Sequence, residues 1–301
     1  ANKKYLVYIT GSNAKMLSRD IQTVLGGRFL DALIYPYTFA EYLAASGVAL
    51  EKEWQYGGQR AVVQKLFADY MKWGGFPELL LFRNKRNWLN SLYDKILLGD
   101  IIQRNKVKNE NALRLTMKRL AENVMQPISY NRIANVIRTT GTSIAVSSVS
   151  DYVRYAVDAC MIFSLENYAS KFVEKETVKK HYFVDNGLLS IFLLDGNTAL
   201  LENLCAIHLH KKYGDKLYFY NKNIEVDFLI VDEGYAVQVS YSIYGDGKQE
   251  TFDRETKALV QLDKYLSLNR MIIVTYDEDG VVTLDNGKQI EVIPVWKWLL
   301  E

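Results

Sequence analysis

A short run of small polar residues follows the first strand-like segment of the chain. Residues 5–10 (YLVYIT) are apolar, β-branched or aromatic, which is the pattern of a buried parallel strand. Gly11, Ser12 and Asn13 stop this run. Open α/β folds bind ligands at the carboxyl edge of the sheet, so Ser12 and Asn13 are placed for contact with a ligand. The alternative is that both residues only cap the helix expected over residues 14–25.

A phosphate-binding loop, which would complete a nucleotide site, does not occur in the sequence. The pattern G-x-x-x-x-G-K-[ST] is missing, because Gly247-Lys248 and Gly287-Lys288 lack the upstream glycine and the following Ser or Thr. No acidic strand end that could hold Mg²⁺ precedes residues 5–10 either. We therefore expect this chain to bind a nucleoside triphosphate poorly and to carry no cofactor and no metal ion of its own.

A second candidate surface consists of basic residues that could contact nucleic-acid phosphates. These residues are Arg154, Lys171, Lys175, Lys179 and Lys180. Glu174 and Glu176 dilute the charge of the lysine-rich segment, and Asp151 lies beside Arg154 on the same expected helix. Base readout needs several donors on one face, so packing or protein contact stays open as the alternative to DNA contact.

The amino-terminal half of the chain divides into two segments. Residues 1–38 contain two strand-like runs and one helix, a fragment of an α/β sheet that is too small to fold alone. Residues 39–125 repeat apolar side chains at three- and four-residue steps, which predicts a small helical lid.

The carboxy-terminal half also divides into two segments. Residues 126–198 contain helices expected to be capped by Ser129 and Ser147, then strands expected at 161–166 and 181–185, the elements of a winged helix-turn-helix. Residues 199–301 are expected to fold as a helix, three strands, a second helix and a strand, followed by a last strand and a short helix. The whole chain is thus predicted to be a multidomain α/β protein.

Several sequence motifs occur in a fixed order along the chain: YITGSNAKML, LGGRF, IYPYTFAEYL, YMKWGGFPE and LLGDIIQRN. In this order they resemble a family of bacterial and archaeal AAA-type ATPases with a restriction-endonuclease-like C-terminal domain of unknown function. The resemblance covers essentially the whole chain. It implies the C-terminal fragment of a P-loop AAA core (1–38), a helical lid (39–125), a winged helix (126–198) and a degenerate nuclease-like domain (199–301).

The resemblance also implies roles for three residues of the AAA fragment. In that family the strand matching residues 5–10 carries a sensor for the γ-phosphate or the attacking water, which implies Ser12 or Asn13 as the sensor. Arg28 would be a charge-stabilising arginine, and the alternative makes it a surface residue. The phosphate cradle would lie upstream of Ala1, so ATP and Mg²⁺ are expected for a longer parent protein.

Residues 199–301 are similar in element order to the restriction-endonuclease-like core. In that core a helix carboxylate, an aspartate on the second strand and an E-x-K motif on the third strand surround a metal ion. The matching positions are Glu202, Asp227, Gln238 and Ser240. Glu225 precedes Asp227 by two residues, so on a strand both side chains share one face.

The third strand of this site lacks the expected lysine. Ser240 carries no charge that could balance a transition state, and losing such a contact costs about 3 kcal/mol. Lys248 is a replacement only across the flexible loop 244–247. A metal-dependent nuclease is therefore the weaker alternative, and the four matching residues are expected to be relics hydrogen-bonded to neighbouring strands.

Bulk composition sets the remaining expectations. The 301 residues are 49% hydrophobic and have a formal charge of +2, which favours packed domains over a uniformly basic surface. Cys160 and Cys205 lie inside apolar runs, not at metal-binding spacing. No signal peptide or membrane-length apolar run is visible. We expect a cytoplasmic ATP-driven switch acting on a protein or nucleic-acid partner, with a non-catalytic DNA-binding module as the alternative and the oligomeric state open.

Overall fold

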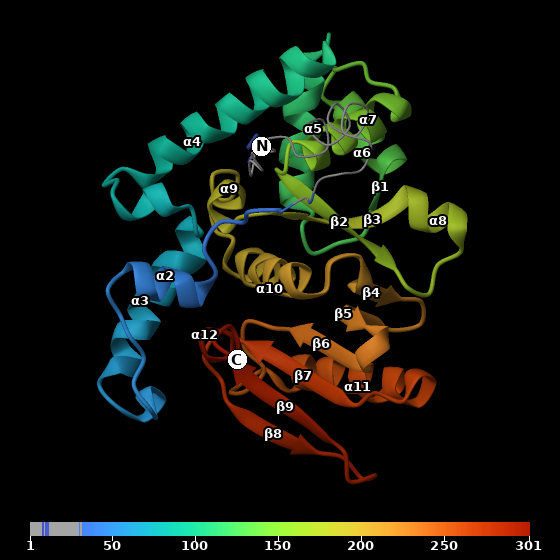
Figure 1. The fold of residues 1–301 in the computed structure, drawn as a ribbon. Helices are drawn as coiled ribbons and strands as arrows, with labels where there is room; N and C mark the ends of the chain where they lie inside the picture. Colours follow the sequence, from blue (N-terminus) through green and yellow to red (C-terminus); the bar gives the residue numbers. More distant parts are fainter. Residues whose placement is uncertain (1–7, 9, 12–29, 31) are drawn as a thin grey trace, which may run out of the picture.

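The structure, a computed structural model, describes residues 8, 10, 11, 30 and 32–301. The described part is α/β, as predicted, and contains one mixed sheet of nine strands in the order β1-β3-β2-β4-β5-β6-β7-β9-β8 (Figure 1). The strands are β1 Ile128–Ser129, β2 Ile162–Asn167, β3 Val178–Phe183, β4 Tyr218–Asn221, β5 Glu225–Ile230, β6 Tyr235–Val239, β7 Arg270–Thr275, β8 Gly280–Thr283 and β9 Gln289–Pro294.

Helices surround this sheet and form the region before it. They are α2 Phe39–Ala45, α3 Gln59–Trp73, α4 Lys85–Lys95, α5 Glu110–Glu122, α6 Tyr130–Thr139, α7 Val146–Asp158, α8 Phe172–Thr177, α9 Asn186–Ser190, α10 Asn197–Tyr213, α11 Gln249–Leu266 and α12 Val295–Trp298. A π-helical segment, Ile96–Gln103, continues α4, and short 3₁₀ turns occupy Trp54–Tyr56, Pro77–Leu80, Gly214–Lys216 and Val231–Glu233. Within the described part, no helix has the length and hydropathy that a membrane crossing requires.

Local capping chemistry sets several helix starts. The Thr38 side chain accepts the Glu41 backbone N–H while the Glu41 carboxylate accepts that of Thr38, which makes a capping box for α2. Ser129 caps α6 as predicted, through a 3.2 Å hydrogen bond from the Arg132 N–H to its hydroxyl. The predicted cap at Ser147 is wrong. The backbone is extended at Ala145 and helical from Val146, so Ser147 lies in the first turn of α7.

The hairpin β2–β3 differs from the prediction in its second strand. β2 and β3 pair antiparallel, with Ile162 opposite Phe183 and Leu165 opposite Lys180. β3 spans Val178–Phe183, not residues 181–185, because Asp185 already caps α9 by accepting the Gly187 N–H. The connection expected between the strands contains the helix α8, and β1 and β8 are further elements that the hydrophobic pattern did not predict.

The sheet continues without a break from the hairpin into the carboxy-terminal segment. β2 and β4 pair in parallel, with Glu166 opposite Tyr218 and Asn167 opposite Phe219. The Asn167 amide reinforces this junction, because it donates to the Asn221 carbonyl (2.6 Å) and accepts the Asn221 N–H (3.0 Å). The boundary expected between residues 198 and 199 therefore falls inside a segment that joins two parts of one sheet.

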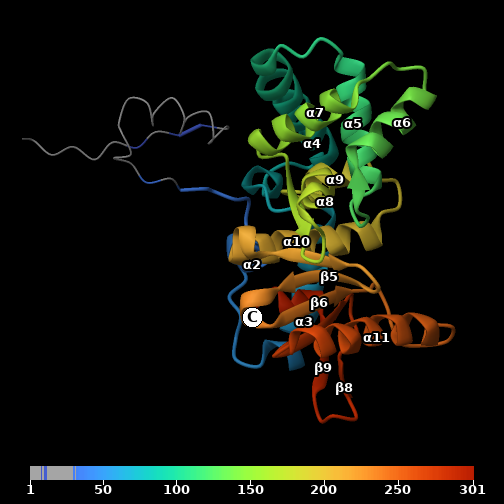
Figure 2. The same ribbon diagram turned by 90° about the vertical axis from the view of Figure 1, so that its right-hand side faces the viewer.

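Two long helices cover opposite faces of the sheet. Figure 2 shows α10 and α11 on either side of β5 and β6. Leu201 and Cys205 of α10 belong to the larger hydrophobic core, which reaches from α2 to α12, whereas Leu259 and Leu262 of α11 belong to a smaller core. Each such buried leucine contributes about 1.5–3 kcal/mol through removal of apolar surface from water. Residues of α10 are thus held rigidly against the sheet.

Candidate functional site

A fully buried lysine lies among three carboxylates on the α10 side of the sheet. The Lys180 side chain has no exposed surface. Its Nζ lies 3.0 Å from Asp227 Oδ1, 3.2 Å from Glu225 Oε1 and 3.4 Å from Glu202 Oε1. We call these four residues the Lys180 cluster.

The cluster joins three elements that are far apart in the chain. Lys180 comes from β3, Glu202 from α10, and Glu225 and Asp227 from β5. β2 and β4 separate β3 from β5 in the sheet, so the lysine side chain extends across them, with Nζ 5.7 Å from the ring centre of Phe219. Charge pairing thus links the hairpin to the carboxy-terminal strands.

Strand alternation explains why Lys180 belongs to this cluster whereas its sequence neighbours Lys179 and His181 do not. Successive side chains on a strand point to opposite faces. Tyr182 shares the face of Lys180, and its hydroxyl donates to Glu202 Oε1 at 2.7 Å. Lys179 belongs to the other face and pairs with Glu166 at 3.1 Å. His181, also on that face, hydrogen-bonds Ser164 through Nδ1.

A glutamine connects the cluster to β6 and α11. Gln238 Oε1 accepts the Asp227 backbone N–H at 2.8 Å, and Gln238 Nε2 donates to the Glu225 carbonyl (3.2 Å) and to Glu255 Oε2 (2.7 Å). Asp227 Oδ2 accepts the backbone N–H of Val239 at 3.0 Å. These contacts fix the Asp227 carboxylate relative to both neighbouring elements, so its second oxygen is directed at Lys180.

Burial shifts the protonation of this cluster strongly. Burial raises the pKa of Glu202 to about 8, even though the Lys180 charge acts to lower it. Burial acts to lower the pKa of Lys180, but Glu202, Asp227 and Glu225 together raise it above its ordinary value. At neutral pH the lysine is therefore a fixed cation, while burial makes Glu202 easier to protonate than an exposed glutamate.

The structure brings together the residues matched to the nuclease-like core, with one exception. Glu202 and Asp227 meet at Lys180, and Gln238 supports Asp227 through the backbone. Ser240 instead donates its hydroxyl to the Ser242 carbonyl at 3.3 Å. Lys248 lies exposed at the start of α11. The ammonium beside Glu202 and Asp227 belongs to Lys180 of β3.

The prediction that Lys180 contacts nucleic acid is wrong, because its ammonium is enclosed by protein. Lys179 and Arg154 are engaged with acidic residues: Lys179 with Glu166, and Arg154 with Asp151 at 2.7 Å. Lys171 is exposed, and the Lys175 ammonium lies 5.9 Å from the ring centre of Tyr168. For these four residues, nucleic-acid contact stays a prediction.

A second arrangement anchors the segment just before the helical residues 39–125, which we call the lid. We call residues 35–38 the strap. Tyr37 donates its N–H to the Gly75 carbonyl, and its own carbonyl accepts the Tyr70 hydroxyl, both at 2.8 Å. Lys211 of α10 donates to the Pro36 carbonyl at 2.7 Å, and its ammonium lies 5.4 Å from the Tyr35 ring centre. The strap is therefore bonded both to the lid and to α10.

A buried carboxylate ties the lid to the start of α9. Asp185 accepts the N–H of Gly75 through Oδ2 and that of Gly187 through Oδ1, each at 2.7 Å. Burial raises the pKa of Asp185 to about 6, against the effect of these two hydrogen bonds. A Cβ atom at Gly75 would lie 2.3 Å from the Tyr37 carbonyl oxygen, so this close approach requires glycine. We call Asp185, Gly75 and Gly187 the Asp185 junction.

Amide side chains extend this junction into α10. Asn186 Nδ2 donates to the carbonyls of Met71 (2.7 Å) and Leu200 (2.9 Å). Its Oδ1 accepts from Asn203 Nδ2, and Asn203 Oδ1 accepts the Phe183 N–H at 2.8 Å. The lid, β3 and α10 therefore share one buried hydrogen-bond network.

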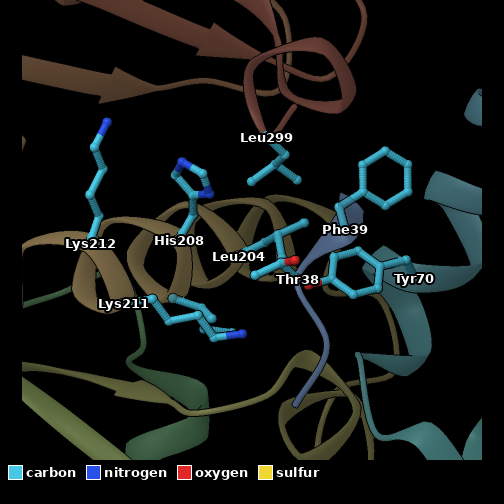
Figure 3. A pocket seen from close by; sticks show the side chains of 9 residues that line it. Thr38, Phe39, Tyr70, Leu204, His208, Lys211, Lys212 and Leu299 are labelled. Atoms are coloured by element: carbon cyan, nitrogen blue, oxygen red, sulfur yellow. The ribbon is translucent and has the colours of Figure 1, made fainter. Parts of the chain in front are cut away.

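A small pocket of about 210 Å³ lies where the end of the strap meets α10 and α12 (Figure 3). Phe39, Leu204 and Leu299 give it a mainly apolar lining. His208 on its wall is neutral near pH 7, because burial lowers the pKa of its imidazole to about 4. Lys211 also lines the pocket but is engaged with the strap. The pocket thus lies beside a joint between elements, not beside the Lys180 cluster.

The residues predicted as an ATPase sensor and arginine, Ser12, Asn13 and Arg28, lie outside the described residues. Their roles stay predictions. Comparison with known proteins bears on the same region. Residues 1–43 match the model of a family described as an AAA domain, and residues 64–199 match a domain of unknown function (DUF8612).

Two relatives match nearly the whole chain. An uncharacterized protein of Methanocaldococcus jannaschii is 31% identical over 308 residues, covering 98% of this chain and 68% of the relative. An uncharacterized protein of Haemophilus influenzae is 31% identical over 304 residues, covering 98% of this chain and 71% of the relative. No solved structure matches the chain.

Proposed function

This chain belongs to the family of those archaeal and bacterial relatives, and we propose that it is the carboxy-terminal portion of an AAA-type ATPase. In this proposal the ATPase works as a nucleotide-driven switch on a protein or nucleic-acid partner. The match of residues 1–43 to an AAA domain supports the assignment to AAA-type ATPases. The chain has no phosphate-binding loop of its own, so it binds ATP poorly by itself.

The observation that carries the proposal is the bonding of the strap. Residues 35–38 lie within the AAA match, which ends at residue 43. Lys211 and Gly75 hold the strap to α10 and to the lid. A displacement of the AAA part would therefore pull on both elements at once, since short hydrogen bonds and close packing transmit movement with little slack.

The proposed movement has a route towards the carboxy-terminal strands. α10 carries Lys211 near its end and Glu202 near its start. Asn203, next to Glu202, bonds the backbone of β3 at Phe183. A shift of α10 would thus change the Lys180 cluster and the hairpin together. For coupling between the sites, these contacts would have to take a different arrangement in each nucleotide state.

ATP and Mg²⁺ are the proposed ligands of the complete AAA domain. Ser12 or Asn13 would contact the γ-phosphate or the attacking water, and Arg28 would stabilise charge that develops on the transferred phosphoryl group. These side chains supply hydrogen-bond donors or charge. In this proposal the phosphate-binding loop and the residues that bind Mg²⁺ belong to sequence outside these 301 residues.

Calorimetry tests the proposed ATP binding directly. We expect a protein that includes the complete AAA domain to bind ATP in the presence of Mg²⁺, and the 301-residue chain to bind it far more weakly. Replacement of Asn13 by Ala in the longer protein should slow hydrolysis. If the longer protein takes up no ATP, the proposal fails.

Exchange of backbone amides tests the proposed coupling. In the longer protein, hydrogen–deuterium exchange in α9 and α10 should differ between the ATP-bound and ADP-bound forms. Lys211→Met should reduce this difference by removing the bond to Pro36. Lys212→Met is the matched control, because Lys212 lies beside the Tyr213 ring and bonds no strap residue among those described. Equal effects of the two variants would exclude the strap as the connection.

A further inference from the structure

We infer that the pocket between α2, α10 and α12 binds a small carboxylate whose apolar body is about the size of a benzene ring. The carboxylate would accept a hydrogen bond from the imidazole of His208, and the apolar body would fill the space beside Leu204 and Leu299. The inference goes beyond the proposed ATPase, because none of its steps depends on nucleotide binding.

One face of α10 forms a large part of this pocket. The residues of this face recur at three- and four-residue steps, the spacing of side chains that share one side of a helix. They are Leu204, Ile207, His208, Lys211 and Lys212. Phe39 of α2 and Leu299, which follows α12, complete the apolar walls (Figure 3). Both are buried, so packed elements fix the shape of the pocket.

The volume of the pocket limits the size of its ligand. The pocket measures about 210 Å³, and an apolar cavity of about 150 Å³ is enough to bind benzene. Phe39, Leu204 and Leu299 supply the apolar contacts that such a body needs. The body of the ligand is therefore a single ring or a branched aliphatic group, and a nucleotide is too large.

Most polar groups on the pocket walls already have partners. The Tyr70 hydroxyl and the Lys211 ammonium donate to carbonyls of the strap. The Thr38 hydroxyl donates to the Glu41 carboxylate at 2.9 Å. The imidazole of His208 differs, because it has no hydrogen-bond partner among the residues that the structure describes. His208 is therefore the wall residue with polar atoms left for a ligand inside the pocket.

The charges around His208 favour an anionic ligand. Burial lowers the pKa of its imidazole to about 4, and the positive charges of Lys212 and Lys211 act in the same direction. At pH 7 the neutral ring keeps one N–H that can donate to a carboxylate. The two acids that act on Lys211, Asp185 and Glu41, already accept hydrogen bonds from backbone N–H groups. A bound carboxylate would therefore meet a positive surrounding and one available donor.

Phenylacetate tests the inference on the full 301-residue chain. Calorimetry should show binding at one site, about tenfold tighter than that of benzylamine, which has a similar shape but the opposite charge. Proton NMR gives a second readout. The bound anion should raise the pKa of His208, because an anion favours the charged form of the ring. Absence of saturable phenylacetate binding, or equally tight binding of benzylamine, overturns the inference.

His208→Phe removes the ring nitrogens but keeps an aromatic ring beside Trp298. It should weaken phenylacetate binding about tenfold, as expected for the loss of a hydrogen bond to a charged group. His210→Phe is the matched control, because His210 also lies on α10 but stacks on Phe163 at 4.2 Å and does not line the pocket. It should leave the affinity at the wild-type value. Equal losses in the two variants contradict the inference.

Leu299→Trp tests the position of the ligand by filling the pocket. The folded variant should no longer bind phenylacetate, and binding at wild-type strength would place the ligand elsewhere and overturn the inference. Should this variant not fold, hydrogen–deuterium exchange of the wild-type chain decides the position. Phenylacetate should slow exchange in α2, α10 and α12 and leave α11 unchanged. Protection confined to other elements would overturn the inference as well.

Discussion

The Lys180 cluster and the Asp185 junction stabilise buried charge in two different ways. In the first, three carboxylates surround an ammonium brought from another element. In the second, one carboxylate is held by the backbone N–H groups of Gly75 and Gly187. Lys180 and Asp185 lie only five positions apart, one within β3 and the other just after it. Five residues thus separate an ion-paired site at Lys180 from a hydrogen-bonded site at Asp185.

This difference determines which changes each site tolerates. Removing the ion partner of a buried charge leaves that charge uncompensated, whereas a backbone N–H is lost only when the residue becomes proline. The Lys180 cluster should therefore be sensitive to the charge of its side chains. The Asp185 junction should be sensitive to shape and to the direction of its hydrogen bonds.

The largest expected effect is that of Lys180→Met. Breaking a buried pair in this way costs about 3–5 kcal/mol of unfolding free energy. Lys179→Met, which removes a partly exposed pair with Glu166, should cost at most about 1 kcal/mol. Urea denaturation in metal-free buffer measures both. Similar losses in the two variants would mean that the cluster contributes no more than a surface ion pair.

A smaller loss is expected from Gly75→Ala. The added Cβ would lie 2.3 Å from the Tyr37 carbonyl oxygen, and overpacking of this kind costs about 1–3 kcal/mol. Gly99→Ala is the control, because a Cβ there meets no atom within 4 Å. The control should be neutral or slightly stabilising in thermal unfolding. A neutral Gly75→Ala would show that the strap and the lid can separate without cost.

Asp185→Asn should lower the free energy of unfolding by roughly 1–3 kcal/mol, as Gly75→Ala does, because one hydrogen bond is then misdirected. The carboxylate accepts from two N–H groups, but an amide offers one acceptor and places an NH₂ group against the other donor. Asp185→Glu keeps both acceptors but lengthens the side chain, so it separates geometry from charge. Denaturation midpoints at pH 7 give the comparison, and an unaffected Asp185→Asn protein would contradict it.

The pH dependence of stability should distinguish the acids from the histidines. The pKa of Glu202 is raised to about 8, so the folded state binds more protons than the unfolded state above pH 4.5. This group's contribution is therefore lost as pH rises from about 4.5 through 8. Glu202→Gln should flatten the unfolding free energy across that window. An unchanged pH profile would mean that Glu202 is ionised when folded.

At neutral pH the smallest expected effect is that of His181, and it grows as pH falls. Burial lowers the pKa of this imidazole to about 3, and nearby Lys179 acts in the same direction. The unfolded state then binds more protons below pH 6.5, so stability is lost as pH falls from 6.5 towards 3. His181→Gln should lessen this acid-side loss while leaving the profile above pH 7 unchanged. Thermal melts between pH 4 and pH 8 measure the difference.

Sequence patterns predicted the elements better than they predicted the contacts between them. Periodicity located the helix that became α10 and the strand that became β5, because both are long apolar segments with local stop signals. It did not locate β1 and β8, which are short and depend on pairing with neighbours. It began β3 three residues late, because Lys179 and Lys180 were assigned to the connection before it, and ended β3 two residues late, because Asp185 was counted as strand although it caps α9.

The role of Lys180 could not be read from its own surroundings in the chain. Lys179 and Lys180 stand side by side, and nothing local tells which of them turns inward. The answer depends on Glu202 and Asp227, which approach only after α10 and β5 have packed. The absence of lysine at position 240 was visible in the sequence, but the position of the Lys180 ammonium between Glu202 and Asp227 was not. Both the inward turn of Lys180 and the position of its ammonium depend on contacts between residues far apart in the chain.

The parallel pairing of β2 with β4 has a consequence for dissection of the molecule into fragments. A cut between residues 198 and 199 would leave β2 and β4 as open edges with unpaired N–H and C=O groups. Such edges recruit strands from other molecules. Halves produced separately should therefore self-associate, while co-expressed halves should recombine into one soluble particle.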